Sequence, residues 1–217
     1  MLQGLIFDLD GVIVNSHPDH RRVWRTFFAS LGRQYCDDEL EFVVEGHKRE
    51  DILRHFLGAL PDEQLKDYGA RKEALFRAST PEPETVKGLH EFLQQAEQAG
   101  LPMAVASSAG RERVEYTLKR LQFRERFSVI VTCKDVQSCK PDPAIFHAAA
   151  EGLGVQASGI LVCEDAVNGV EAAKKAGMRC LAIAANGRTP LLHQAGADKI
   201  IPDFTAANLA ELRTLFI

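Results

Sequence analysis

Two carboxylates stand one residue apart near the N-terminus, directly after a short apolar run. Asp8 and Asp10 follow residues 5–7 and precede Gly11 in the stretch FDLDGVIVNS. Like charges this close repel one another, and removal from water strengthens the repulsion. The pair therefore indicates either a solvated turn, in which Asp and Gly are common, or a site built around a cation.

Three later segments also carry polar side chains directly after short apolar runs or in the loop that follows one. They supply hydroxyls, carboxylates and an ammonium group: Ser107, Ser108, Glu164, Asp165 and Lys140. The carboxyl ends of parallel strands meet at one edge of a sheet, so we expect these side chains to lie together. A hard divalent cation with oxygen ligands would relieve the repulsion among the carboxylates, and Mg²⁺ fits that description.

Each segment also has an ordinary structural interpretation. Ser107 and Ser108 could cap a helix, using the same N–H groups that bind anions. Glu164 and Asp165 could be the acidic residues favoured at a helix N-terminus. Lys140 could be a solvated surface lysine, although the following proline holds it in an extended conformation. The agreement of four segments at one predicted edge favours a functional site.

The elements that must position these residues alternate between strands and helices. Apolar runs predict strands over residues 4–7, 103–106, 129–132, 160–163 and 180–184. Helical patterns lie between them, over residues 84–99, 111–121, 144–153 and 167–176. This alternation predicts an α/β fold with a doubly wound parallel sheet, similar to a Rossmann fold.

The alternation is interrupted after the first strand by a segment that contains only helical patterns. Helices are predicted over residues 19–31, 38–44, 49–57 and 63–78. We expect a helical bundle inserted into the core, with crossings at residues 14–18 and 79–83. The predicted division is a core of residues 1–15 and 83–217, and a helical cap of residues 16–82.

Bulk composition limits the class of protein. The chain has 217 residues, 46% of them apolar, and a net charge of -4, which argues against nucleic acid as a partner. No apolar run approaches the roughly 18 residues that span a bilayer, and the N-terminus lacks the features of a signal peptide. The five cysteines form no C-x-x-C. We therefore expect a cytoplasmic monomer with reduced thiols that binds neither membranes nor nucleic acid.

The four stretches FDLDGVIVNS, VASSAG, SCKPDP and LVCEDAVNGVEAAKKAGM, in this order, resemble the haloacid dehalogenase superfamily. The helical insertion is similar to that family's cap domain. Within the superfamily the chain most resembles the β-phosphoglucomutase and sugar-phosphate phosphatase subgroup. The resemblance implies phosphoryl transfer with Mg²⁺ as the cofactor and a phosphorylated small molecule as the substrate.

The resemblance also implies roles for individual residues. Asp8 would be the nucleophile, and Asp10 would be the general acid and base. Ser107 and Lys140 would hold phosphoryl oxygens. The implied Mg²⁺ ligands are Asp8, Asp10, Glu164 and Asp165. Asp10 would contribute its backbone carbonyl, and Glu164 would lie in or beside the ligand shell. The implied substrate-binding residues are Ser108, Ala109, His20, Arg49 and Lys72.

The choice between phosphatase and mutase depends on the cap and on one loop. His20, Arg49 and Lys72 match cap positions that the mutases use, although phosphatases of the subgroup can keep similar residues. Ala109 and Gly110 stand where the mutases have a hydroxyl and a basic residue that help hold a second phosphate. We therefore predict a sugar-phosphate phosphatase, with a β-phosphoglucomutase-type mutase as the alternative. A non-catalytic binding module would require a lost catalytic residue, and none is lost.

Overall fold

The core is a six-stranded parallel sheet in a computed structural model that describes residues 1–79, 82–184 and 188–217. The strand order is β3-β2-β1-β4-β5-β6. The strands are β1 (Gly4–Phe7), β2 (Met103–Ser107), β3 (Val129–Thr132), β4 (Ile160–Glu164), β5 (Arg179–Ile183) and β6 (Lys199–Ile201). The chain moves outward from β1 through β2 to β3 and then returns to the other side of β1. Phe7 of β1 therefore pairs with Val105 of β2 on one side and with Cys163 of β4 on the other. Ligands of such sheets bind where the strand order reverses, and Asp8 follows β1 at that point.

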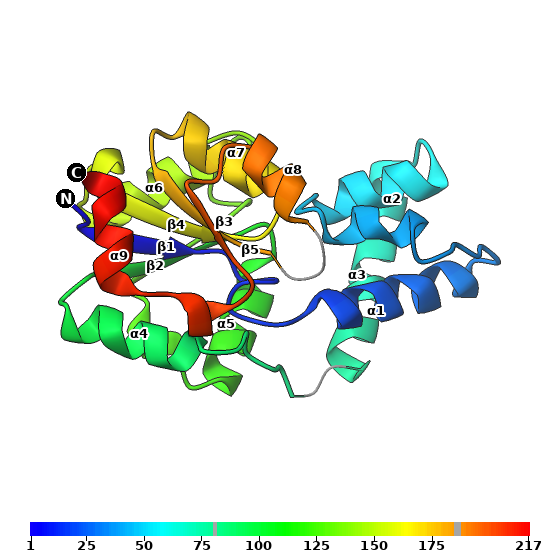
Figure 1. The fold of residues 1–217 in the computed structure, drawn as a ribbon. Helices are drawn as coiled ribbons and strands as arrows, with labels where there is room; N and C mark the ends of the chain where they lie inside the picture. Colours follow the sequence, from blue (N-terminus) through cyan, green and yellow to red (C-terminus); the bar gives the residue numbers. More distant parts are fainter. Residues whose placement is uncertain (80–81, 185–187) are drawn as a thin grey trace.

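Helices cover both faces of the sheet (Figure 1). One face packs against α4 (Leu89–Gln98), α5 (Arg111–Arg120) and α9 (Leu209–Arg213), and the other against α6 (Ala144–Leu153), α7 (Val167–Lys175) and α8 (Thr189–Gln194). Side chains of β1 alternate between the faces: Leu5 and Phe7 join one apolar cluster and Ile6 joins the other. Because both faces are covered, the strands are apolar throughout. The predicted fold class is confirmed.

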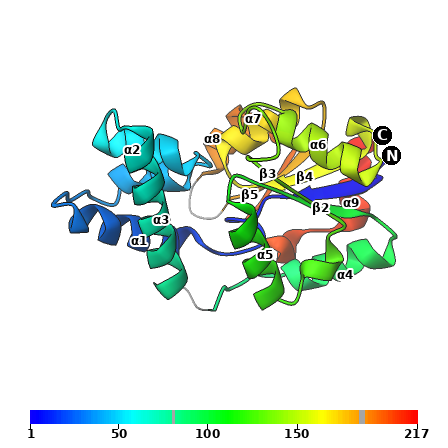
Figure 2. The ribbon, with the colours of Figure 1, turned by 180° about the vertical axis from the view of Figure 1, so that it is seen from behind.

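The helical insertion has a hydrophobic core of its own. It consists of α1 (His17–Ser30), a 3₁₀ helix (Glu39–Val44), α2 (Arg49–Leu57) and α3 (Asp62–Ser79). Aromatic rings dominate its interior, where Trp24 stacks on Phe28 with ring centroids 5.2 Å apart. Figures 1 and 2 show this cap beside the core, beyond the carboxyl ends of the strands. The predicted domain boundaries remain a prediction.

Several predicted bounds differ from those in the structure. The helix predicted over 84–99 begins only at Leu89, because Thr85 bridges to Val14 and Gly88 adopts a positive φ of 77°. The helix predicted over 38–44 is the 3₁₀ turn, and the first crossing ends at Ser16 because α1 starts at His17. Part of the second crossing, residues 80 and 81, lies outside the described residues. The short elements β6, α8 and α9 were not predicted.

The prediction that all thiols are reduced is wrong for one pair. Cys133 and Cys139 form a disulfide with their Cα atoms 5.2 Å apart. The loop between β3 and α6 returns on itself and brings them together, which their spacing of six residues did not indicate. Cys163 and Cys180 are buried free thiols, and Cys36 is an exposed one. Among the described residues, no helix has the length and apolar character needed to cross a membrane.

Candidate active site

Asp8 lies at the end of β1 in a buried ion triad. The ammonium group of Lys140 donates to Asp8 Oδ1 and to Glu164 Oε1, both at 2.6 Å, and to the carbonyl oxygen of Ala106 at 3.0 Å. All three charged residues are buried. Three segments that are distant in sequence thus meet at the carboxyl edge of the sheet, as the strand-end argument predicted.

The triad holds two carboxylates around one cation, and this imbalance appears in the pKa values. Burial raises the pKa of Asp8 to about 7, and the nearby Glu164 adds to the effect, while Lys140 opposes it. Burial lowers the pKa of Lys140, but the two carboxylates more than offset this and leave it raised. Lys140 is therefore a permanent cation. A further positive charge near Asp8 would favour its ionised form.

Asp10 is held by three donors from different parts of the molecule. Its Oδ1 accepts from the Ser16 hydroxyl at 2.6 Å, lies 3.2 Å from His20 Nε2, and accepts from Arg113 Nη1 at 2.8 Å. A second Arg113 nitrogen donates to Oδ2, which makes the pair bidentate. Burial raises the pKa of Asp10, but Arg113 and then His20 reverse this and hold it well below its usual range.

Arg113 was not predicted from the sequence. It lies in the first turn of α5, and its guanidinium is 5.3 Å from the centroid of the Phe76 ring on the cap. The only sequence signal was a basic residue near the start of the helix that follows the Ser107 loop. Such residues are common on helix surfaces, so the signal was not specific. Arg113 thus connects α5, the Asp10 turn and the cap.

Asp165 lies beside the Asp8–Gly11 turn, while its neighbour Glu164 belongs to the triad. A Cβ on Gly11, whose φ is 74°, would overlap the Asp165 carboxylate. The Asp165 carboxylate pairs with His17 at 3.0 Å and with Arg188 at 3.3 Å. Burial lowers the pKa of His17, but Asp165 more than offsets this and leaves it raised. His17 and Arg188 are two further contacts of the Asp165 carboxylate that were not predicted from the sequence.

The predicted metal ligands fit a divalent cation only in part. Both oxygens of Glu164 are engaged, Oε1 by Lys140 and Oε2 by the backbone N–H groups of Asp165 and Ala166. In the part of the chain that the structure describes, no group of three or more His, Cys, Asp or Glu side chains converges as a metal site. Asp8 and Asp165 remain, and one or two carboxylates with a carbonyl and waters form a common Mg²⁺ environment.

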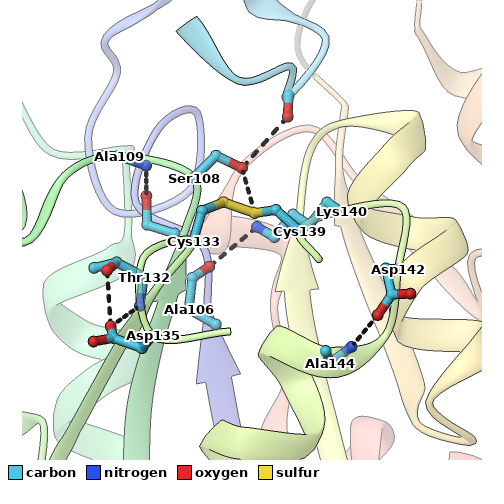
Figure 3. The surroundings of a disulfide bond; sticks show 12 residues. Ala106, Ser108, Ala109, Thr132, Cys133, Asp135, Cys139, Lys140, Asp142 and Ala144 are labelled. Carbon is cyan, nitrogen blue, oxygen red and sulfur yellow. Dashed lines mark hydrogen bonds between the residues drawn. A yellow bond between two sulfur atoms is a disulfide. The ribbon is translucent and has the colours of Figure 1, made fainter. Parts of the chain in front are cut away.

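The loop after β2 follows the carboxyl end of the neighbouring strand. Ser107 is buried, and its hydroxyl accepts from the N–H of Ala109 at 3.1 Å. The hydroxyl of Ser108 lies 3.4 Å from the carbonyl oxygen of Gly46 on the cap and 3.7 Å from the sulfur of Cys139 (Figure 3). The loop therefore touches the cap on one side and the Lys140 loop on the other.

The three predicted cap residues line the same space in different environments. Lys72 is 4% exposed, and its Nζ lies 3.2 Å from His20 Nδ1 and 4.8 Å from the centroid of Phe76. Burial lowers the pKa of Lys72 to about 7, with Arg113 adding to the effect, and burial and Lys72 lower that of His20 to about 3. Arg49 packs against Gly69, and its Nε is buried without a hydrogen-bond partner.

A cavity of about 450 Å³ lies between the cap and the core, and every predicted site residue lines it. Its walls hold the triad, the Asp10 turn, the Ser107 loop and three cap residues. The predicted residues that line it are Asp8, Asp10, Ser107, Ser108, Ala109, Lys140, Glu164, Asp165, His20, Arg49 and Lys72. A volume of this size accommodates a small metabolite. The site therefore combines a buried carboxylate, several cations and room for a small anionic ligand.

A family model described as haloacid dehalogenase-like hydrolase matches residues 5–183. The chain belongs to this family. Validoxylamine A 7'-phosphate phosphatase from Streptomyces hygroscopicus subsp. limoneus is 32% identical to the chain over 208 residues, covering 94% of this chain and 95% of that protein. The predicted superfamily and the class of phosphoric monoester hydrolases are confirmed.

Solved structures with the same fold superpose along 98% or more of the chain. CbbY from Rhodobacter sphaeroides, in complex with xylulose-(1,5)bisphosphate, is 26% identical, with a TM-score of 0.84 over 98% of this chain and 99% of that one. β-Phosphoglucomutase from Clostridium difficile has a TM-score of 0.88 at 20% identity, covering 100% of this chain and 97% of that one, and shows the fold alone.

Proposed function

We propose that the protein is a Mg²⁺-dependent phosphatase that hydrolyses a small phosphorylated metabolite, a sugar phosphate, through an aspartyl-phosphate on Asp8. The observation that carries the proposal is the Asp8 carboxylate beside Lys140, buried at the switch point of the sheet and open to the cavity. A carboxylate that attacks a phosphate needs nearby positive charge, and catalysis of this kind is mostly positioning and charge neutralisation. The relative named as a phosphatase supports the same class.

In the first half-reaction, Asp8 attacks phosphorus and the bond between phosphorus and the sugar oxygen breaks. Asp10 gives its proton to that oxygen, and the free sugar leaves. In the second half-reaction, Asp10 takes a proton from water as that water attacks the phosphorus of the aspartyl-phosphate. The bond between phosphorus and Asp8 breaks, phosphate leaves, and both carboxyl groups return to their starting states. Ser107 and Lys140 hold phosphoryl oxygens through both steps.

The Asp10 pair with Arg113 sets a condition on this cycle. Asp10 accepts two hydrogen bonds from Arg113, and its pKa is well below its usual range, so in this arrangement it is ionised. An ionised Asp10 is ready to accept a proton from water. To donate a proton in the first step it must be separated from the guanidinium, and binding of an anionic substrate would draw Arg113 away.

Asp8 and Asp165 would hold Mg²⁺, with the backbone carbonyl of Asp10. The ion would neutralise charge on the phosphoryl oxygens and on the Asp8 carboxylate, whose pKa is raised in its absence. Glu164 is better suited to hold Lys140, because both of its oxygens are already engaged. The proposed Mg²⁺ ligands are therefore Asp8, Asp165 and the backbone carbonyl of Asp10, without Glu164.

Arg49 and Lys72 would bind the part of the substrate distal to the phosphoryl group, and His20 would close the cap over Asp10. The unpartnered Arg49 Nε and the weakly compensated Lys72 support an anionic or hydroxyl-rich group there. The replacement of a basic and a hydroxyl residue by Ala109 and Gly110 supports hydrolysis over mutase chemistry, which must retain a bisphosphate. Cytoplasmic location, a monomeric state and the absence of nucleic-acid or membrane partners remain predictions.

A screen of phosphorylated sugars and small metabolites, with phosphate release as the readout, tests the proposal. We expect Mg²⁺-dependent release from at least one sugar phosphate. The decisive comparison is β-glucose 1-phosphate with a trace of the 1,6-bisphosphate, followed for glucose 6-phosphate and for phosphate. Isomerisation without release of phosphate would establish the mutase instead.

A further inference from the structure

The Cys133–Cys139 disulfide closes the loop that presents Lys140. Cys133 follows directly after Thr132, the last residue of β3, and Cys139 immediately precedes Lys140. Figure 3 shows the disulfide between Ser108 and Ala106, next to Lys140. The disulfide thus joins the end of β3 to Cys139, the residue before Lys140, and Lys140 in turn pairs with Asp8.

Apart from this bond, the second half of the loop is attached mainly by apolar packing of Val136 and Cys139. The first half is fixed by Asp135, which accepts from the N–H and the hydroxyl of Thr132, both at 2.7 Å, and from Arg111 at 2.9 Å. Among the described residues, 136–138 make no hydrogen bond. Val136 packs against the apolar cluster under the sheet and Cys139 is buried in it, and the disulfide adds a covalent link to the end of β3 directly before Lys140.

The two sulfur atoms differ in access and in surroundings. Cys133 is half-buried and lines the cavity, so a small thiol can reach it, whereas Cys139 is 6% exposed. The Ser108 hydroxyl lies 3.7 Å from the Cys139 sulfur, where it can stabilise a departing thiolate. This asymmetry suits thiol–disulfide exchange, in which one sulfur is attacked and the other leaves.

We propose that Cys133 and Cys139 form a reversible thiol–disulfide exchange site that fixes or releases the Lys140 loop. Its reactants are thiols and disulfides, small or protein-borne. In reduction, a thiolate of a dithiol attacks the Cys133 sulfur, and Cys139 leaves as a thiolate that takes up a proton. The second thiol of the reductant then attacks the mixed disulfide, loses its proton, and releases Cys133. The two cysteines gain two electrons and two protons, and the reductant becomes a disulfide.

The effect on catalysis rests on the proposed phosphatase function, whereas the exchange itself does not. In the disulfide form, Lys140 is held against Asp8 and Glu164. In the dithiol form the loop from Cys133 to Cys139 loses its closure, and Lys140 is positioned less accurately. Because small misplacements of a charge-stabilising group are costly, we expect kcat/KM to fall by about 10-fold on reduction.

The test places the full-length protein in buffers of defined ratios of reduced to oxidised dithiothreitol. Of the five cysteines, two are paired, so the oxidised protein should show three free thiols after denaturation and the reduced protein five. Hydrogen exchange should rise in residues 133–140 on reduction and remain unchanged in the β-strands. Phosphate release should fall in parallel with the loss of the disulfide, and all three readouts should return on reoxidation.

Cys133→Ser and Cys139→Ser should each behave as the reduced protein in every buffer, while Cys36→Ser should respond as the wild type does. Hydrogen exchange of the strands reports whether each variant folds. Five free thiols under all oxidising ratios, or unchanged exchange in residues 133–140 on reduction, would overturn the proposal. An inactive protein that shows the thiol and exchange changes would contradict the phosphatase function and leave the exchange site established.

Discussion

The core and the cap place cations around the cavity in opposite ways. In the core, each of the cations described above contacts a carboxylate: Lys140 lies between Asp8 and Glu164, and Arg113 binds Asp10. In the cap, Lys72 is nearly fully buried, and the described part of the chain offers it no salt bridge, only His20 and aromatic rings. The core thus holds compensated charges, and the cap holds a cation whose compensation is incomplete.

This difference indicates separate tasks. Compensated charges are stable in the free protein without any ligand, which suits groups that act on the phosphoryl group of every substrate. A buried cation without a carboxylate is costly until an anion binds, so its position favours recognition of one substrate over another. The expected consequences are a large effect of core substitutions on turnover with any substrate, and a smaller, substrate-dependent effect of cap substitutions.

Asp8→Asn tests the core side of the comparison most severely. We expect kcat for p-nitrophenyl phosphate to fall by about 10⁴-fold or more, because the amide cannot act as the nucleophile. Lys140 would still pair with Glu164, so the thermal unfolding midpoint should change little. Asp38→Asn, on the exposed surface of the cap, is the matched control. Turnover close to that of the control would remove Asp8 from the reaction.

Lys140→Met should affect both stability and activity. It leaves Asp8 and Glu164 buried without their cation, and breaking such a pair costs about 3–5 kcal/mol of unfolding free energy. Loss of charge stabilisation should lower kcat by about 10²–10³-fold.

Adding Glu164→Gln should restore part of the stability and none of the activity, as urea unfolding and phosphate release would show. Lys119→Met, at an exposed position of α5, is the control. If the double variant regained activity, Lys140 would serve the fold rather than the reaction.

The same contrast explains what the sequence could predict. Asp8 follows β1, Glu164 ends β4 and Lys140 lies in the loop after β3. The geometry of a parallel sheet brings these strand ends together, so the meeting of the three residues was predictable. Arg113, His17 and Arg188 contact the site from helix starts and a loop, where basic residues are common for other reasons. The Cys133–Cys139 bond depended on the path of an irregular loop, which no periodicity describes. The start of α4 was misplaced because Thr85 pairs with Val14, a contact between distant residues.

Arg49→Ala tests the recognition role of the cap. The Nε of Arg49 has no partner, while its other two nitrogens contact the Gly69 carbonyl and Glu50. A hydrogen bond from this charged group to a distal anion would contribute about 1.5–3 kcal/mol, so KM for sugar phosphates with a second anionic group should rise by about 10-fold or more. Kinetics with p-nitrophenyl phosphate, which lacks such a group, should be unchanged. Arg54→Ala, on the exposed face of the same helix, is the control. Equal losses with both substrates would mean that the cap positions the reacting groups.

Lys72→Met gives the smallest effect and the most direct test of an incompletely compensated charge in the cap. The pKa of Lys72 is about 7 in the folded protein, and in the unfolded chain it has the ordinary lysine value of 10.5. Between pH 7 and pH 10.5 the unfolded chain therefore binds more protons than the folded one. The free energy of unfolding of the wild type should therefore rise with pH across that window, by up to about 1.4 kcal/mol per pH unit. Lys72→Met should lack this rise.

The relevant quantity is the difference in unfolding free energy between Lys72→Met and the wild type, because groups that titrate equally in both cancel. His20, whose pKa Lys72 helps to lower to about 3, is neutral in the wild type throughout this window. This difference should favour the variant most at pH 7 and shrink toward zero by about pH 10.5, as urea unfolding at several pH values would measure. Lys66→Met, exposed on the same helix, should show no trend. A pH-independent difference for Lys72→Met would mean that Lys72 is solvated in the free protein. The cap would then gain its uncompensated charge only when it closes over a substrate, and the contrast with the core would hold only for the closed enzyme.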